Sequence, residues 1–147
     1  MRAAHAFTFI ALLWLAAAAG AQQLPEVALT VNGHKLMAEV AHTDPARMQG
    51  LMHRRILPED SGMLFVFPDV SRHAMWMMNT YIPLSVAFLD ERGAIINIED
   101  MKPQTRDTHP ASKPAKYALE MNLGWFRKRG IKPGTKIEGV EHAPSAR

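Results

Sequence analysis

The sequence predicts an α+β fold that is rich in β-strands: a mostly antiparallel small barrel or curled sheet of about seven or eight strands, with two short helices. Three observations predict it. Apolar residues alternate with polar ones over several short segments, which is typical of half-buried strands. Turn-forming residues separate these segments, so the connections are mostly hairpin-like and too short for strand–helix–strand crossovers. Only two segments carry helical spacing and capping residues.

The first predicted element is a hairpin. Val27, Leu29 and Val31 alternate with polar or small residues over 26–31, as expected of a strand with one buried face. Asn32-Gly33 follows, and both residue types tolerate the positive φ of a tight hairpin turn. The same alternation returns over 34–40, which completes the hairpin.

A short helix is predicted to begin at Asp44-Pro45. Asp44 can accept hydrogen bonds from the free N–H groups of the first turn, and Pro45 fits there because its missing N–H costs nothing. Met48, Leu51 and Met52 follow at i, i+3 and i+4 and form one apolar stripe. Gly50 weakens so short a helix by up to about 1 kcal/mol, so a close backbone contact is expected there.

The remaining elements follow from the same rules. Further strands are predicted at 63–67, 73–80, 84–88, 94–98, 116–121 and 136–140, with a loop at 90–93 between the middle two. Residues 101–114 carry three prolines and form a long loop, which in a small domain is often functional. Asn122 is expected to begin the second helix, which runs to Arg129, and Gly130 suits the left-handed position after it.

The first 21 residues are expected to be a signal peptide. Arg2 supplies a positive charge, an apolar stretch runs from Ala6 to Ala19, and Ala19-Gly20-Ala21 is a small-x-small cleavage site. An uncleaved membrane anchor is the alternative, but the apolar stretch is short of the roughly 20 residues that a bilayer-spanning helix needs. The sequence therefore predicts a periplasmic or secreted protein that begins at Gln22, with a single domain over 22–147.

Composition excludes several classes of protein. Of 147 residues, 48% are hydrophobic and 21% charged, which excludes collagen-like, coiled-coil and disordered chains. Without Arg2, the 17 basic residues become 16 against 14 acidic ones, a net charge of +2, which is too mild to indicate a nucleic-acid partner. Zero cysteines exclude thiol catalysis and disulfide exchange.

Several blocks, in order along the chain, carry a family resemblance. They are Gly50-Leu51-Met52-His53-Arg54, Gly62-Met63-Leu64-Phe65-Val66-Phe67, Trp76-Met77-Met78-Asn79-Thr80, Pro83-Leu84, Phe88-Leu89-Asp90 and Tyr117-Ala118-Leu119-Glu120-Met121-Asn122. This series, over about 27–140, resembles domain-of-unknown-function family 192 (DUF192), often exported in bacteria and archaea. The resemblance implies a compact β-rich α+β domain and no established activity. Met78 stands where the family usually has Lys, and Ser85 where it usually has Asp, so a polar site made by both charges would be lost here.

The block 76–80 supplies the first candidate binding residues. As a strand it would place Trp76, Met78 and Thr80 on one face and Asn79 on the other. In a binding site Trp76 would be a stacking platform for sugars or peptide side chains, and Asn79 and Thr80 would form hydrogen bonds. The alternative is structural: Trp76 fills the core, while Asn79 and Thr80 satisfy the backbone before Pro83.

Arg54 and Glu120 are the other candidates. Glu120 should lie on the face of its strand opposite Tyr117, Leu119 and Met121. A buried Arg54–Glu120 pair would anchor a ligand carboxylate or brace the helix against the sheet, because an unpaired buried charge is costly. The sequence does not establish that the two residues meet.

Metal binding and catalysis are weakly indicated. His73, Met75 and Met77 would be soft ligands for Cu(I), but same-face residues of a strand are about 6.6 Å apart and cannot share one ion, so no metal or other cofactor is expected. Known catalytic motifs are absent.

The favoured function is an exported module that binds a small ligand, a peptide or a glycan. The alternatives are a hydrolase with spatially assembled carboxylates and a non-catalytic envelope scaffold.

Overall fold

The computed structural model describes residues 23–147. The expected signal peptide and its cleavage site after Ala21 lie outside the described residues. The strands are β1 (Glu26–Val31), β2 (His34–Ala41), β3 (Ser61–Ser71), β4 (Ala74–Met75), β5 (Leu84–Leu89), β6 (Ile95–Met101), β7 (His109–Pro110) and β8 (Ala115–Asn122). The helices are α1 (Asp44–Gln49), α2 (Trp125–Lys128) and a 3-10 turn, η1 (Val140–His142).

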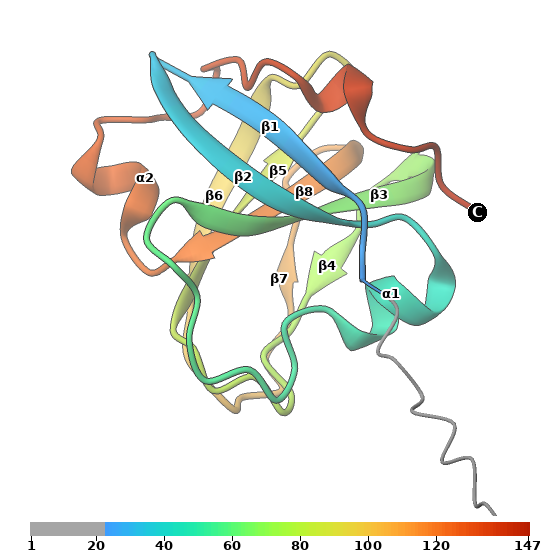
Figure 1. Ribbon diagram of the computed structural model, residues 1–147, viewed down its shortest axis with the longest axis vertical. Coiled ribbons are helices and arrows are strands. Elements are labelled where there is room, and N and C mark those ends of the chain that lie inside the picture. Colours follow the sequence, from blue (N-terminus) through green and yellow to red (C-terminus); the bar gives the residue numbers. More distant parts are fainter. Residues whose placement is uncertain (1–22) are drawn as a thin grey trace, which may run out of the picture.

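Six strands form one curled sheet in the order β1-β2-β3-β8-β5-β6, and β4 pairs with β7 in a small second sheet. The predicted β-rich α+β class is confirmed, with a curled sheet rather than a closed barrel. The two helices lie toward opposite ends of the sheet (Figure 1). The first hairpin has the predicted register, with Val31 opposite His34, and both of its turn residues, Asn32 and Gly33, have positive φ.

One prediction about the connections is wrong. β2 and β3 pair in parallel, so the chain between them makes the crossover that parallel neighbours require. α1 and the irregular stretch that follows it provide this crossover. The short helix was visible in the sequence, but residues 53–60 have no periodic pattern, so nothing in them indicated a return to the same end of the sheet.

Two predicted strands are also shorter than expected. Of 73–80, only Ala74–Met75 is a strand, because the chain turns at Asn79, which has a left-handed φ of 54°. Of 136–140, only two isolated bridges form, Lys136 with Ala94 and Glu138 with Thr30. Trp76–Thr80 is therefore a loop, and its side chains do not alternate between two faces of a sheet.

Residues 134–138, the edge-bridging segment, touch both edges of the large sheet. On the β1 side, Thr30 and Glu138 exchange backbone hydrogen bonds of 3.1 and 2.8 Å. On the β6 side, Gly134 donates to the carbonyl of Ile95 at 2.7 Å, and Ile95 donates to the carbonyl of Thr135 at 2.9 Å. The segment therefore satisfies backbone groups that would otherwise be free on both edge strands.

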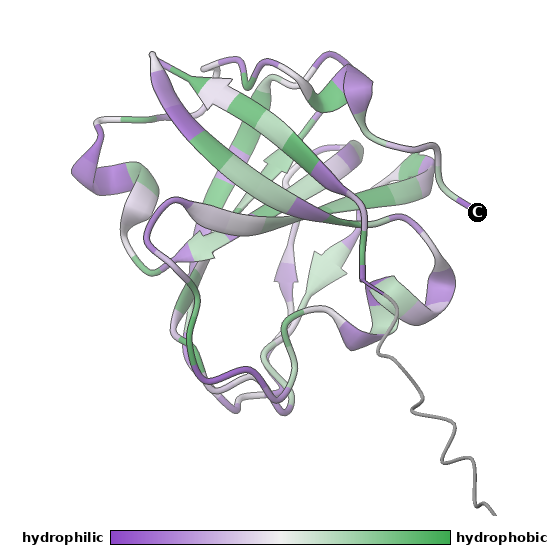
Figure 2. Ribbon diagram, viewed as in Figure 1, coloured by the Kyte–Doolittle hydropathy of each residue, from purple (hydrophilic) through white to green (hydrophobic). Residues whose placement is uncertain are grey.

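The curled sheet separates two groups of buried side chains. The core on one face, called the closed-side core, contains Leu119, Met121, Trp125 and Phe126. The core on the other face, called the groove-side core after the groove described below, contains Met63, Phe65, Val86 and Ala118. Hydrophobic residues dominate the central strands, whereas α2 carries two basic residues, Arg127 and Lys128, in its last turn (Figure 2). β8 contributes to both cores, because its successive side chains point to opposite faces.

Candidate functional site

The site is built around Glu120 on β8. As predicted, Glu120 faces away from Leu119 and Met121, which belong to the closed-side core. Its cross-strand neighbours are Met63 on β3 and Val86 on β5, and both are fully buried. The Glu120 side chain is itself only 3% exposed. A carboxyl group has thus been placed among apolar side chains on the groove side of the sheet.

No residue in the described part of the chain forms a hydrogen bond or an ion pair with the Glu120 carboxyl. Burial raises its pKa from 4.5 to about 8, because removal from water penalises the charged form. Buried polar groups are normally hydrogen-bonded, and an unmade bond costs about 1–3 kcal/mol. Among residues 23–147, the fully enclosed side-chain atom without a hydrogen-bond partner is His109 Nε2. The Glu120 oxygens are not fully enclosed, so water or a ligand in the adjacent space can bond to them.

Glu120 lines a small pocket of about 30 Å³. The other walls are residues 47–52 of α1 and its following turn, together with Phe65, Met75, Trp76 and Thr80. A cavity needs about 10–15 Å³ of such space to hold a water molecule, so this pocket admits one small group. The sequence predicted three of its residues, Trp76, Thr80 and Glu120, as binding candidates, and the structure brings these three together.

An open groove of about 790 Å³ adjoins the small pocket. Its walls are Asp44, Pro45, Arg47, Met48, Gln49, Met52, Trp76 and Met78, and five of these residues also line the small pocket. The volume is in the range of small-molecule sites, which are mostly apolar with a few placed polar groups. Trp76 is 46% exposed and Met48 76% exposed, so apolar surface remains uncovered here.

α1 owes its position to its two caps. Thr43, rather than the predicted Asp44, is the N-cap, and its hydroxyl accepts a hydrogen bond from the Ala46 amide at 3.3 Å. The helix ends at Gly50, whose amide donates to the carbonyl of Ala46 at 2.8 Å and whose φ is +47°. A Cβ at Gly50 would lie 3.2 Å from Cζ of Phe65. The close backbone contact expected at this glycine is thus present.

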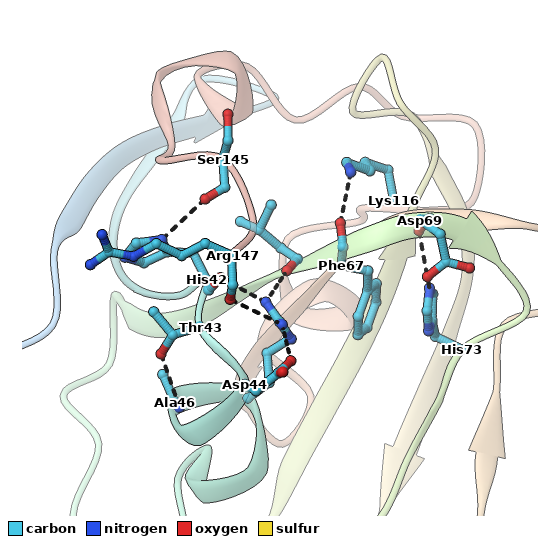
Figure 3. A network of polar contacts seen from close by, with 12 residues as sticks. His42, Thr43, Asp44, Ala46, Phe67, Asp69, His73, Lys116, Ser145 and Arg147 are labelled. Carbon is cyan, nitrogen blue, oxygen red and sulfur yellow. Dashed lines mark hydrogen bonds and ion pairs between the residues drawn. The ribbon is translucent and has the colours of Figure 1, made fainter.

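Arg47 fixes α1 to the sheet and to the last residues of the chain. Its guanidinium donates to the carbonyl of His42 at 2.7 Å and of Val66 at 2.9 Å, and it pairs with Asp44. The amide of Arg147 donates to the same His42 carbonyl at 2.8 Å. Figure 3 shows His42, Asp44 and Arg147, three members of this network, beside the start of α1. Because its donors are engaged, Arg47 lines the small pocket without pairing with Glu120.

Arg54 and Asn79, the other two predicted site residues, lie outside the lining of the small pocket. Arg54 forms a two-pronged ion pair with Glu39 on β2, at 2.5 and 2.6 Å, and not with Glu120. The hydrogen bond with Glu39 raises the pKa of Arg54. The carbonyl of Asn79 accepts from the His53 amide at 2.9 Å. Both residues therefore brace the turn after α1, which forms one wall of the site.

The two departures from the family pattern lie in different pockets. Met78 lines the groove, whereas Ser85 lines a separate pocket of about 310 Å³. The Ser85 hydroxyl donates to Asp100 at 2.6 Å and accepts from the Gly124 amide at 2.9 Å, and Asp100 also pairs with Arg127. Since these polar groups are satisfied within the fold, the Ser85 pocket is a weaker candidate site than the Glu120 pocket.

The groove walls were only partly visible in the sequence. Met48, Leu51 and Met52 were expected to form one apolar stripe, but only Leu51 is buried.

Glu120 is the one carboxylate in the lining of the small pocket, so the lining lacks the facing pair of carboxylates that a hydrolase would use. Among residues 23–147, no cluster of three or more His, Asp or Glu could hold a metal. No helix within this range is long and apolar enough to span a membrane.

Two solved structures are similar to this chain. A protein from Sinorhizobium meliloti 1021, described as a candidate transcription regulator, is 38% identical with a TM-score of 0.72, over 78% of this chain and 92% of that one. A protein of unknown function from Novosphingobium aromaticivorans DSM 12444 is 33% identical with a TM-score of 0.70, over 77% of this chain and 83% of that one. The search of curated proteins finds no match.

The family model of DUF192, described as "Uncharacterized ACR", matches residues 27–139. The match covers the strands except Glu26, the buried residues of both cores except Val140, and every residue that lines the small pocket. It agrees with the motif blocks that suggested the resemblance. The chain therefore belongs to the DUF192 family.

Proposed function

We propose that this protein is an exported binding module, and that its groove holds an apolar ligand segment while Glu120 provides a polar anchor. The observation that carries the proposal is a buried carboxyl without a partner at the edge of a groove rich in exposed apolar side chains. Since no group of residues 23–147 bonds to this carboxyl, only water or a ligand can complete its hydrogen bonds. A ligand that supplies the missing hydrogen bond or charge removes this cost, and the free energy gained contributes to affinity.

The chemistry of the walls supports an apolar and flexible ligand. Met48, Met52 and Met78 line the groove together with Trp76. Methionine side chains adapt to ligands of different shape, and tryptophan offers a rigid contact surface. A peptide segment fits these walls better than a glycan, because sugar recognition relies on more convergent hydrogen-bonding groups than Gln49 and Asp44 offer. Arg54 and Asn79 would act indirectly, by holding the turn after α1.

Export is part of the proposal and has its own test. The supporting observation is the leader pattern of Arg2, the apolar stretch and Ala19-Gly20-Ala21. N-terminal sequencing of protein from the cell envelope should begin at Gln22. Recovery of the intact chain anchored in the membrane would contradict this part of the proposal and would leave the groove unaffected.

The binding proposal is tested by methyl NMR of mature protein with ¹³C-labelled methionine methyl groups. Short blocked apolar peptides, sugars and peptidoglycan fragments are added in turn. A true ligand should shift the signals of Met48, Met52, Met75 and Met78, which line the groove and the small pocket. The signal from buried Met121, on the other face of the sheet, should stay in place. If no compound shifts the groove methyls selectively, the proposal fails.

A matched pair of variants then separates the groove from general surface effects. Met48 and Met37 are both exposed methionines, at 76% and 44%, but only Met48 lines the groove. Met48→Ala should weaken binding several-fold, while Met37→Ala on β2 should leave binding unchanged. Both variants should keep the melting temperature close to that of the parent, since little buried surface is lost in either.

A further inference from the structure

We infer that the group entering the small pocket is the ammonium of a lysine side chain, carried by an apolar peptide segment in the groove and paired there with Glu120. This inference rests on the proposed function, because it names the ligand class of the same site. It concerns the charge, the size and the shape of the pocket, and each of these favours lysine over the other common side chains.

The charge of the pocket favours a cation. Glu120 and Arg47 are its only titratable side chains, and Arg47 is engaged by the carbonyls of His42 and Val66 and by Asp44. The neighbouring strands present Met63, Phe65 and Val86 toward Glu120, and none of these carries a charge. An anionic ligand would face a carboxyl group with no free cation to meet it, so one positive charge is the complement that the pocket lacks.

The size and shape of the pocket favour an ammonium over a guanidinium. The volume of about 30 Å³ suits a compact ammonium, whereas the planar guanidinium of arginine is wider and carries five donors in a fixed fork. The hydroxyl of Thr80 donates to the carbonyl of Met78 at 3.2 Å, which leaves its lone pairs free to accept from a ligand. Glu120 and Thr80 together therefore offer acceptors for an ammonium and its three donors.

The walls suit the rest of a lysine side chain. Its four-carbon stem packs well against apolar surface while the charged head reaches a polar partner. Met52, Met75 and Trp76 provide such a surface between the groove and the pocket. The indole of Trp76 also attracts a nearby cation through its ring face. A peptide backbone in the groove could thus place one lysine in the pocket and leave its apolar neighbours against Met48 and Met78.

This pairing predicts a proton release. Burial raises the pKa of Glu120 to about 8, so its carboxyl is mostly protonated at pH 7 when the site is empty. A bound ammonium favours the carboxylate and lowers that pKa. Binding at pH 7 should therefore release close to one proton. Affinity should rise with pH by up to about tenfold per unit until pH 8 is passed.

The experiment uses isothermal titration calorimetry of mature protein with the blocked peptide Ac-Leu-Val-Lys-Val-Leu-NH2 and with versions carrying norleucine or arginine in place of lysine. Norleucine keeps the four-carbon stem and lacks the ammonium. We expect lysine to bind at least about tenfold more tightly than norleucine or arginine at pH 8. Buffers of different ionisation enthalpy measure the proton release at pH 7. n-Butylamine alone should bind far more weakly than the peptide, because it leaves the groove empty.

Variants assign the effect to one carboxyl. Glu120→Gln should abolish the preference for lysine over norleucine and the proton release, while Glu91→Gln, an exposed carboxyl in the turn between β5 and β6 and outside both pockets, should retain both. If Glu120→Gln does not fold, the pH dependence and the lysine-to-norleucine ratio of the parent protein still decide the matter. Equal affinity for lysine and norleucine would overturn the inference and leave the groove proposal standing. Butylamine binding as tight as the peptide would overturn the peptide ligand. No selective groove shifts with any probe would overturn both proposals.

Discussion

The two tryptophans of residues 23–147 lie in opposite surroundings. Trp125, at the start of α2, is 2% exposed, and its indole N–H donates to Asp60 at 3.0 Å. Its ring also lies edge-on against Phe126, with the centroids 5.3 Å apart. Trp76 is 46% exposed at the wall of the groove. One side of the sheet has closed over its large aromatic residue, whereas the other side leaves one available to a ligand.

The polar groups of the two sides differ in the same way. Beside Trp125, Arg129 pairs with Asp60 at 3.0 Å and stacks over the indole ring at 4.3 Å. Beside Trp76, the Glu120 carboxyl has no partner among the described residues. On the closed side, the polar side chains bond to one another within the fold. On the groove side, the Glu120 carboxyl remains available to bond to a ligand.

The largest expected effect separates the two tryptophans. Trp125→Ala should destabilise the protein by about 3–5 kcal/mol, because it leaves a cavity in the closed-side core. Trp76→Ala should cost only about 1 kcal/mol, since half of that side chain already contacts solvent. Urea denaturation of both variants measures the difference. Equal losses would show that Trp76 supports the core and would remove the contrast.

The pH dependence of stability is the next expected effect. The folded-state pKa of Glu120, about 8, lies above its ordinary value of 4.5, so the folded protein holds a proton that the unfolded chain releases between these values. The stabilisation is complete below pH 4.5 and is lost as the pH rises through 8. Relative to Glu120→Gln, which cannot ionise, the parent protein should lose about 2–4 kcal/mol between pH 5 and 9. Urea titrations of both proteins at pH 5, 7 and 9 measure this, and parallel stability curves would contradict it.

A smaller effect is expected at the helix end beside the groove. Gly50→Ala should cost about 1–3 kcal/mol, because a side chain at this positive φ is strained and its Cβ would press on Phe65. Gly33→Ala in the first hairpin is the matched control, since Gly33 also has positive φ but meets no atom within 4 Å. The excess loss in Gly50→Ala, measured by thermal unfolding, reports the packing of α1 on the sheet. Equal losses would show that only backbone strain matters.

The smallest expected effect concerns the ion pair that braces the turn after α1. Arg54 and Glu39 are about one-third exposed, so solvent screens their attraction. A double-mutant cycle with Arg54→Gln and Glu39→Gln should give a coupling of about 0.5–1 kcal/mol, lessened in 1 M salt. A coupling well above this range would make the brace as strong as a buried pair and would blur the contrast between the two sides.

The fold could be predicted where neighbouring residues determine the structure. The first hairpin depends on Asn32-Gly33 and on alternation within each strand, and both signals are local. Alternation also placed Glu120 on the correct face of β8. The parallel pairing of β2 with β3 could not be predicted, because it depends on the path of residues 53–60. The supposed strand at 73–80 failed for a similar reason, since a left-handed turn at Asn79 interrupts an otherwise strand-like composition.

The site could be predicted in part. Trp76, Thr80 and Glu120 were chosen for their chemistry, and the structure places them around one pocket. The sequence could not predict that these three residues lie together, because their positions depend on how α1 and the 76–80 loop pack over β8. The sequence also could not predict the partner of Arg54. Glu39 lies 15 residues away and becomes a neighbour only when β2 pairs with β3. Long-range packing, rather than residue type, decided these points.

The edge-bridging segment has a consequence for aggregation. Residues 134–138 contact Thr30 at one edge of the sheet and Ile95 at the other. If the segment detaches, backbone groups on both edge strands lose their partners, and such edges are the kind of surface on which other chains add as extra strands. One local opening therefore exposes two edges at once, and substitutions that loosen 134–138 should promote aggregation more than equally destabilising substitutions elsewhere.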